Sequence, residues 1–146
     1  MNSKNLILLG TLASTAAHAA ITIEFDYSLD SAAVSPFFPS GSQARQTLEA
    51  AGSAIGTFLN DSLNGISPGS GNTWTARYIN PVNGTTNTVT DMSIGANTVR
   101  IFVGARNLGA GILGAAGLGS INAFGSSSFL SDALHRGEDA SGADRK

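Results

Sequence analysis

The chain has 146 residues, the length of one small domain that can bury a hydrophobic core. Only 12 % of the residues are charged and 42 % are hydrophobic, which argues against a disordered, charge-rich chain. The net charge of −2 offers no electrostatic basis for binding nucleic acid or an anionic membrane surface. The lack of cysteine excludes thiol nucleophiles, disulfides, iron–sulfur clusters and thiolate zinc sites. With two histidines in the whole chain, most catalytic chemistries already lack their residues.

The first 19 residues have the three-part pattern of a secretory signal peptide. Lys4 precedes a short apolar run at residues 6–13, which is well below the roughly 18–20 residues that a membrane span needs. We expect signal peptidase to cut after a small-x-small sequence, and the residues that define this cut are Ala17, Ala19 and the new first residue, Ala20. The sequence therefore predicts an exported protein, secreted or periplasmic, with no stable membrane span.

The exported part of the chain begins with a predicted strand. Residues 21–27 alternate apolar and polar side chains, which is typical of a half-buried strand. A turn-rich loop is expected at residues 28–39, and its neighbouring Phe37 and Phe38 are expected to form a hydrophobic plug beneath it.

A long helix is predicted next, beginning at a Ser42 cap and closed by Gly65. Its apolar side chains recur at helical spacing, at Leu48, Ala51, Ile55, Phe58, Leu59 and Leu63. Gly52 and Gly56 each cost roughly 1 kcal/mol relative to alanine inside a helix. Because they lie four residues apart, on one face, we expect another element to pack closely there.

A strand hairpin and a further strand follow the helix. Residues 72–80 alternate with Trp74 on one face, and the Asn-Gly turn within residues 81–84 predicts a reversal into a threonine-rich strand at residues 85–92. Residues 97–104 carry the pattern most typical of a buried strand.

The sequence pattern of the C-terminal third of the chain predicts few helices or strands. Residues 104–119 read as a long glycine-rich loop, and residues 129–134 carry a short helical stripe capped by a serine at 126–128. Residues 137–146 are expected to form a disordered polar tail, which leaves one domain at residues 20–136. The predicted fold class is α+β: a twisted, mostly antiparallel or mixed sheet of about four strands, one long backing helix and a short C-terminal helix.

Two motifs resemble binding sites but lack the residues or the context that such sites need. Residues 109–114 match the dinucleotide-binding glycine pattern, but four residues separate them from the preceding strand and further glycines disfavour the helix that the fingerprint needs. His135 could bind a metal or act as a base, but a zinc motif needs a second histidine and a nearby glutamate, whereas position 136 is arginine. A helix-terminal histidine that complements the helix dipole is the favoured interpretation. No cofactor is predicted.

The acidic residues leave one alternative open. Glu24 and Asp26 share the polar face of the first strand, with Asp30 just beyond it, and this group could bind a cation. The ordinary solvated face of a strand is the favoured interpretation. Asp61 and Asp91 have no predictable partner, and no nucleophile–base arrangement occurs in the sequence. We therefore predict no catalytic, metal-binding or cofactor-binding residues.

Several short phrases together carry a resemblance to a known family. They are Ile23-Glu24-Phe25-Asp26-Tyr27, Leu48-Glu49-Ala50-Ala51, Pro68-Gly69-Ser70-Gly71-Asn72-Thr73-Trp74-Thr75-Ala76, Val103-Gly104-Ala105-Arg106-Asn107-Leu108-Gly109, and Ser126-Ser127-Ser128-Phe129-Leu130 with Arg136-Gly137. In their order and spacing they resemble exported bacterial zincin-type metalloprotease-like proteins, which often carry a PEP-CTERM sorting tail. The likeness covers nearly all of the predicted exported chain.

The resemblance implies the N-terminal half of a zincin-like fold. In that family the zinc-binding His-Glu-x-x-His-x-x-Gly-x-x-His helix lies downstream of these phrases, and no such motif occurs in these 146 residues. The expected function is therefore that of an exported, non-catalytic N-terminal portion of such a protein, whose uncovered sheet face favours self-association. The alternative is a self-sufficient secreted binding or surface protein that uses its glycine-rich loop and threonine-rich hairpin. An active hydrolase is the least supported reading.

Overall fold

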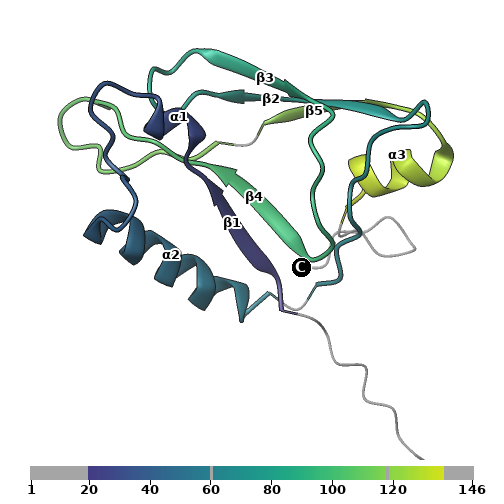
Figure 1. The fold of residues 1–146 in the computed structure, drawn as a ribbon, viewed down its shortest axis with the longest axis horizontal. Helices are drawn as coiled ribbons and strands as arrows, with labels where there is room; N and C mark the ends of the chain where they lie inside the picture. Colours follow the sequence, from purple (N-terminus) through teal and green to yellow (C-terminus); the bar gives the residue numbers. More distant parts are fainter. Residues whose placement is uncertain (1–19, 60, 118, 137–146) are drawn as a thin grey trace, which may run out of the picture.

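The computed structural model describes residues 20–59, 61–117 and 119–136, which form an α+β fold (Figure 1). It contains five strands in two sheets and three helices. In chain order the elements are β1 (Thr22–Asp26), α1 (Ser28–Ser31), α2 (Gln43–Gly56), β2 (Thr73–Ile79), β3 (Thr86–Thr90), β4 (Thr98–Phe102), β5 (Ser120–Phe124) and α3 (Ser127–Leu134). The α+β class is confirmed, but the expected single sheet of about four strands is wrong.

The first sheet is a parallel pair of β1 and β4, with Glu24 opposite Arg100 in the register. α2 runs along β1 on the side away from β4 (Figure 1). The alternation predicted for the first strand is confirmed, since Ile21 and Tyr27 are buried at its two ends. The strand at residues 98–102 is correctly located but is not a buried strand: Ile101 is 38 % exposed, because β4 has one neighbouring strand and no layer over its α2-facing side.

α2 begins where predicted, with the Ser42 hydroxyl accepting a hydrogen bond from the Arg45 N–H, but it ends at Gly56 rather than near residue 63. The two glycines explain both its position and its length. Gly52 lies under the Phe25 ring, and Gly56 lies against the Ile21 carbonyl oxygen, where a methyl group would not fit. After Gly56 the chain turns away through Thr57, whose hydroxyl donates to the Ala54 carbonyl at 2.7 Å.

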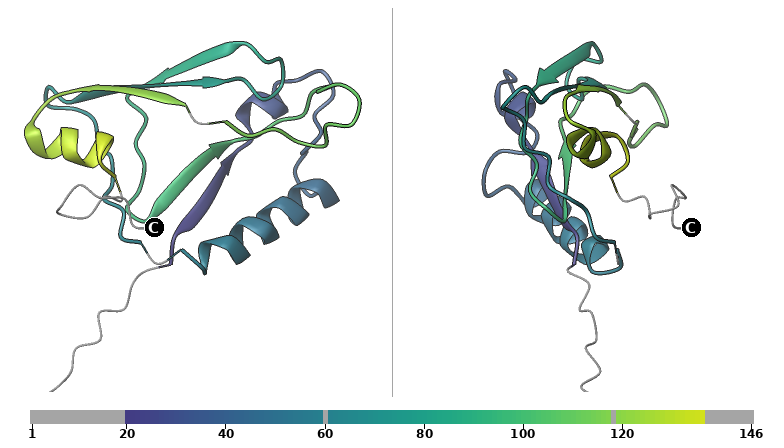
Figure 2. Two further views of the ribbon diagram at one scale, coloured as in Figure 1. Left: turned by 180° about the vertical axis from the view of Figure 1, so that it is seen from behind. Right: turned by 90° about the vertical axis from the view of Figure 1, so that its right-hand side faces the viewer.

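The second sheet is antiparallel, in the order β3-β2-β5, and lies across one end of the β1/β4 pair (Figure 2). The predicted hairpin is confirmed as β2 and β3. β5 was not predicted, because its five residues follow a long glycine-rich stretch and show too short a pattern to stand out. Its backbone pairing with β2, in which Ala76 lies opposite Ile121, is a tertiary interaction.

The hydrophobic core lies between the second sheet and α3. It consists of buried apolar residues, namely Ile66, Trp74, Ile94, Phe129 and Ala133. Trp74 is 3 % exposed, and its indole N–H donates to the Met92 carbonyl at 2.8 Å. The predicted serine cap of α3 is confirmed at Ser126. A stacked pair of rings, Tyr78 and Phe102 with centroids 4.1 Å apart, connects the two sheets.

The remaining predictions concern the two ends of the chain and the glycine-rich loop. The signal residues Ala17 and Ala19 and the tail at residues 137–146 lie outside the described residues, whereas Ala20 is described and exposed. Residues 104–117 form no helix or strand, as expected for the glycine-rich loop. Among the described residues, no helix is both long enough and apolar enough to cross a membrane.

Candidate functional site

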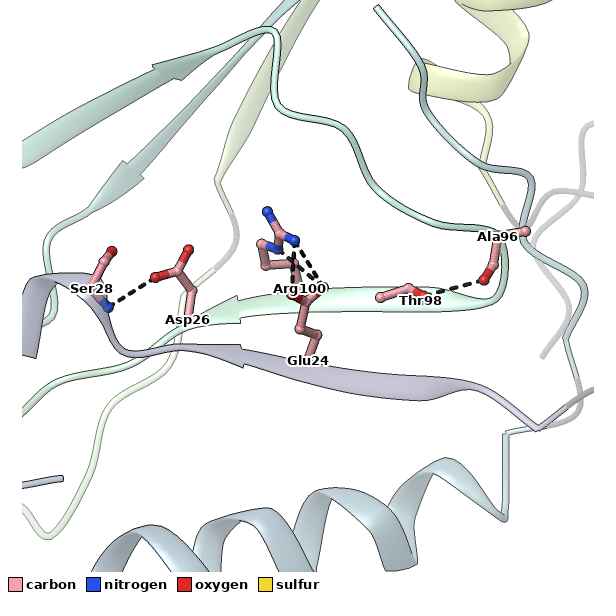
Figure 3. A network of polar contacts seen from close by, with 6 residues as sticks. All are labelled: Glu24, Asp26, Ser28, Ala96, Thr98 and Arg100. Atoms are coloured by element: carbon pink, nitrogen blue, oxygen red, sulfur yellow. Dashed lines mark hydrogen bonds and ion pairs between the residues drawn. The ribbon is translucent and has the colours of Figure 1, made fainter. Parts of the chain in front are cut away.

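The acidic face of β1 was the first candidate site, and the structure shows Glu24 in an ion pair. Both Glu24 carboxylate oxygens accept hydrogen bonds from the Arg100 guanidinium, at 2.8 and 2.9 Å from Nη2 (Figure 3). The pair follows from the parallel register, which sets the two residues side by side on the face away from α2. Side-chain exposures of 21 % for Arg100 and 47 % for Glu24 place the pair at the surface, where such pairs contribute little stability.

The carboxylates of the other two acidic residues, Asp26 and Asp30, accept hydrogen bonds from backbone N–H groups. Asp26 accepts a hydrogen bond from the Ser28 N–H at 2.9 Å, at the start of α1 (Figure 3). Asp30 is buried and accepts from the N–H groups of Phe37 and Phe38, at 3.3 and 2.8 Å. The three carboxylates do not converge, and the described residues contain no group of three or more potential metal ligands. The favoured interpretation of this strand face as solvated agrees with its ion pair and its exposed residues.

The predicted hydrophobic plug is confirmed for Phe38 but is wrong for Phe37. Phe38 packs against Tyr27, with ring centroids 5.9 Å apart, whereas Phe37 is 57 % exposed. The buried Asp30 carboxylate, rather than the two rings alone, fixes this loop. No local sequence signal marks this contact, because the carboxylate accepts from N–H groups seven and eight residues away rather than two residues away as in an Asx turn.

His135 and the glycine-rich motif at residues 109–114 have structural roles. His135 occupies the C-cap of α3, and its backbone N–H donates a hydrogen bond to the Ser131 carbonyl at 3.0 Å. Gly109 and Gly111 have φ values of 93° and 81°, so the loop needs glycine for its turns. No helix follows them in residues 112–117, so the geometry of a dinucleotide-binding turn is not present there.

A groove lies between β1 and α2, and no motif of the sequence predicts it; we call it the β1–α2 groove. Its volume is about 460 Å³, within the size range of clefts that hold ligands. One wall is the outer edge of β1 from Ala20 to Phe25, together with Tyr27. The other wall is one side of α2, formed by Arg45, Glu49, Ser53, Gly56 and Thr57. The spacing of three to four residues between these wall residues is the only sequence signal of this groove.

Tyr27, Arg45 and Glu49 meet at one end of the groove. The Arg45 guanidinium lies 4.0 Å from the centre of the Tyr27 ring and donates to the Glu49 carboxylate at 2.8 Å. The Tyr27 hydroxyl is buried and makes no hydrogen bond of good geometry with any described residue. Burial raises the pKa of Tyr27, the nearby negative charge of Glu49 raises it further against the opposing effect of Arg45, and hydrogen bonding to the Glu49 carboxylate adds to the rise. Tyr27 is therefore a neutral hydrogen-bond donor at physiological pH.

The threonine-rich hairpin presents a second exposed surface, on the side of the sheet opposite Trp74. The cross-strand register sets one kind of side chain on this face of β2 and β3, namely Thr73, Thr75, Thr86, Thr88 and Thr90. Arg77 lies among them, directly opposite Thr88. This face offers hydroxyl groups and one cation for hydrogen bonding, together with the exposed apolar side chain of Ile79 opposite Thr86.

No protein-family model, no curated protein and no solved structure matches this chain.

Proposed function

We propose that this protein is exported and serves as a non-catalytic N-terminal portion of a zincin-type metalloprotease-like protein. The short phrases shared with that family support the proposal, as does the arrangement of a parallel strand pair with a helix packed along it. The predicted signal peptide supports a secreted or periplasmic location.

The observation that carries the proposal is a set of exposed apolar side chains on α2, just beyond it, and on β4. Ile55 and Leu59, on α2 and just beyond it, are 52 % and 39 % exposed. Ile101 of β4 lies opposite Phe25 in the register, so it faces the same way as the ring that packs on Gly52. Burying one such side chain fully is worth about 1.5–3 kcal/mol. Exposed apolar side chains of this kind are expected where a larger fold adds a further layer.

The chain's residues also favour a non-catalytic role. One of its two histidines lies in the predicted signal, and the other, His135, caps α3. A catalytic zinc site uses three protein ligands rich in nitrogen or sulfur, and this chain has no cysteine. We therefore expect no zinc-dependent proteolysis from these 146 residues.

A thermal melt with a hydrophobic dye tests this proposal on residues 20–146. A domain with such exposed apolar side chains should melt broadly and bind dye before it unfolds. Phe58→Ser, which removes an exposed aromatic next to Ile55, should reduce dye binding without lowering the midpoint. A sharp transition above about 60 °C with little dye uptake would contradict the proposal.

Zinc analysis and casein digestion test the non-catalytic part. We expect less than one zinc per chain after dialysis and no casein cleavage with added zinc. One tightly bound zinc per chain that is lost in His135→Ala, together with zinc-dependent cleavage, would show that this part is wrong.

The alternative is a self-sufficient secreted binding protein that uses the glycine-rich loop and the threonine-rich hairpin. The exposed threonine face of β2 and β3 favours it, because hydroxyl groups at regular strand spacing suit a repetitive, hydroxyl-rich polymer. The sharp, dye-free melt that contradicts the first proposal is the result that this alternative predicts.

A further inference from the structure

We infer that Asn64 is a modification site: in the folded protein it loses its side-chain amide in a slow reaction with water, and the resulting carboxylate weakens the attachment of α3. The chain contains two Asn-Gly pairs, Asn64-Gly65 and Asn83-Gly84. Glycine has no side chain to shield its backbone nitrogen, so asparagine before glycine is especially open to this reaction. The inference goes beyond both proposed functions and depends on neither, because each retains this part of the fold.

The reaction is a displacement within the chain. The Gly65 backbone nitrogen gives up its proton to solvent, and its electron pair forms a bond to the side-chain carbonyl carbon of Asn64, Cγ. The C–N bond of the carboxamide then breaks, and the nitrogen leaves as ammonia after taking a proton from water. One molecule of water opens the resulting cyclic imide at either of its two carbonyl groups, which gives aspartate or isoaspartate. Nothing is oxidised or reduced, and water is the only co-reactant.

The surroundings of Gly65 favour this attack. Asn64 is exposed, and the Gly65 N–H donates no hydrogen bond to any described residue. The Arg136 guanidinium donates to the backbone carbonyl oxygen of Asn64 at 2.6 Å. That oxygen belongs to the same peptide group as the Gly65 nitrogen, so the cation stabilises the negative charge that develops there when the proton leaves. The Asn64 side chain is held by a hydrogen bond from its Nδ2 to the Asp132 carboxylate, at the exposed surface.

The second pair, Asn83-Gly84, is protected by more hydrogen bonds. The Gly84 N–H donates to the Asn80 carbonyl at 2.9 Å, so the attacking nitrogen is engaged. The Asn83 side-chain oxygen accepts from the N–H and the hydroxyl of Thr85, at 2.9 and 2.8 Å. These bonds have to break or rearrange before the Gly84 nitrogen can reach Cγ of Asn83. We therefore expect Asn64 to react at least about tenfold faster than Asn83 in the folded protein.

The partner of Asn64 determines the consequence. The Asn64 amide donates to Asp132 of α3 at 2.8 Å, which links the segment before β2 to the helix that packs on the hydrophobic core. Deamidation replaces this donor with a carboxylate, so the hydrogen bond is lost and two negative charges face each other. Isoaspartate also adds one carbon atom to the main chain, two residues before the bridge of Ile66 with Ile94. The modified protein should therefore melt at a lower temperature than the unmodified protein.

Peptide mapping of aged protein tests the modification. The exported chain is kept at mildly alkaline pH, and trypsin then places Asn64 and Asn83 in separate peptides, residues 46–77 and 78–100. Each reaction adds about one dalton, which fragmentation locates at a single residue. The ratio of the Asn64 rate to the Asn83 rate should be at least about tenfold higher in folded protein than in guanidinium chloride, where only the local sequence acts.

Variants test the effect on α3. Ageing should lower the melting temperature of the wild type and of the matched control Asn83→Gln, but not that of Asn64→Gln, because glutamine has to form a larger ring and reacts far more slowly. Asn64→Asp has the charge of the product from the start and should melt below Asn64→Gln. Adding Asp132→Asn to Asn64→Asp should recover part of this difference, since it removes the facing charge.

Four results would overturn the inference. Two concern the reaction: no mass gain at Asn64 in the folded protein, or the same ratio of the two rates in folded and unfolded protein. The other two concern α3: a wild type that gains the mass without losing melting temperature, or an Asn64→Asp protein that Asp132→Asn does not improve.

Discussion

At the scale of single residues, charged side chains of this protein form hydrogen bonds with backbone groups of other segments of the chain. Asp30 holds the loop at Phe37 and Phe38, and Asp91 holds the start of β2. Arg136 donates to three carbonyls that lie close together only in the folded chain. The contacts of Asp91 account for one of the two acidic residues, Asp61 and Asp91, that had no predictable partner in the sequence.

Asp91 makes stability depend on pH. Its carboxylate accepts from the Thr73 hydroxyl at 2.7 Å and from the Trp74 N–H at 2.9 Å, and these hydrogen bonds hold the pKa of Asp91 below its ordinary value of 3.8. A lowered folded-state pKa adds stability that is fully present above the ordinary pKa and is lost as the pH falls through the lower, folded value. We expect the melting temperature of the wild type to fall more steeply than that of Asp91→Asn when the pH is lowered below about 4. Parallel pH profiles for the two proteins would contradict this role.

Arg136 is expected to stabilise the end of the domain. Its guanidinium donates to the carbonyls of Asn64, Gly95 and Thr98 at 2.6–2.8 Å, and burial lowers its pKa. Arg136→Ala should lower the free energy of unfolding by about 1–3 kcal/mol, because carbonyls are left without donors. Arg136→Lys should lose less, since an ammonium group can still reach one or two of them. Chemical denaturation measures both, with Arg77→Ala on the exposed threonine face as the control. A loss for Arg77→Ala as large as that for Arg136→Ala would show that the effect is only one of net charge.

At the scale of elements, Gly52 and Gly56 determine how closely α2 packs against β1. They lower the intrinsic stability of the helix, yet they allow its backbone to approach Phe25 and Ile21. The sequence correctly predicted a close contact on this face. It did not predict where the helix ends, because the apolar spacing continues through Ile55 and Leu59 although no layer covers that side.

Alanine at these glycines should separate helix propensity from packing. Alanine favours a helix by about 1 kcal/mol over glycine. At Gly56 a methyl group would meet the Ile21 carbonyl oxygen, which is backbone and cannot turn away, so Gly56→Ala should destabilise the protein by about 1–3 kcal/mol. At Gly52 it would meet the edge of the Phe25 ring at 2.5 Å, and the ring can rotate, so the loss should be smaller. Urea denaturation of both variants decides this, and a stabilised Gly56→Ala would show that α2 does not pack this closely.

At the scale of the whole molecule, two small sheets share few contacts beyond the Tyr78 and Phe102 stack and the chain segments that join them. The main buried cluster lies under the second sheet, whereas the β1/β4 pair packs against α2 and is otherwise contacted by single rings, Phe38 near Tyr27 and Tyr78 on Phe102. This uneven burial underlies the proposed function, since it leaves apolar side chains of α2 and β4 exposed.

Export is a prediction for the whole chain. Protein recovered from the periplasm or medium should begin at Ala20, because Ala17 and Ala19 are the small residues that signal peptidase requires before the cut. Intact-mass measurement reads the new N-terminus directly. An Ala19→Arg variant should accumulate uncleaved, since a large charged residue does not fit that position. Exported wild-type protein that retains Met1 would refute the prediction.

The sequence by itself determined the local elements: the alternation in residues 21–27 and 72–80, the Asn-Gly turn, and the serine caps at Ser42 and Ser126. These strands, turns and caps depend on interactions between residues a few positions apart, so a local stretch of sequence is enough to predict them. The tertiary structure alone decided that the strands divide into two sheets, that β5 forms at all, and that Glu24 pairs with Arg100. It alone brought β1, Tyr27 and one side of α2 together in a groove. Pairing between segments far apart in the chain depends on which partners remain after every other element has packed, and no local pattern encodes that choice.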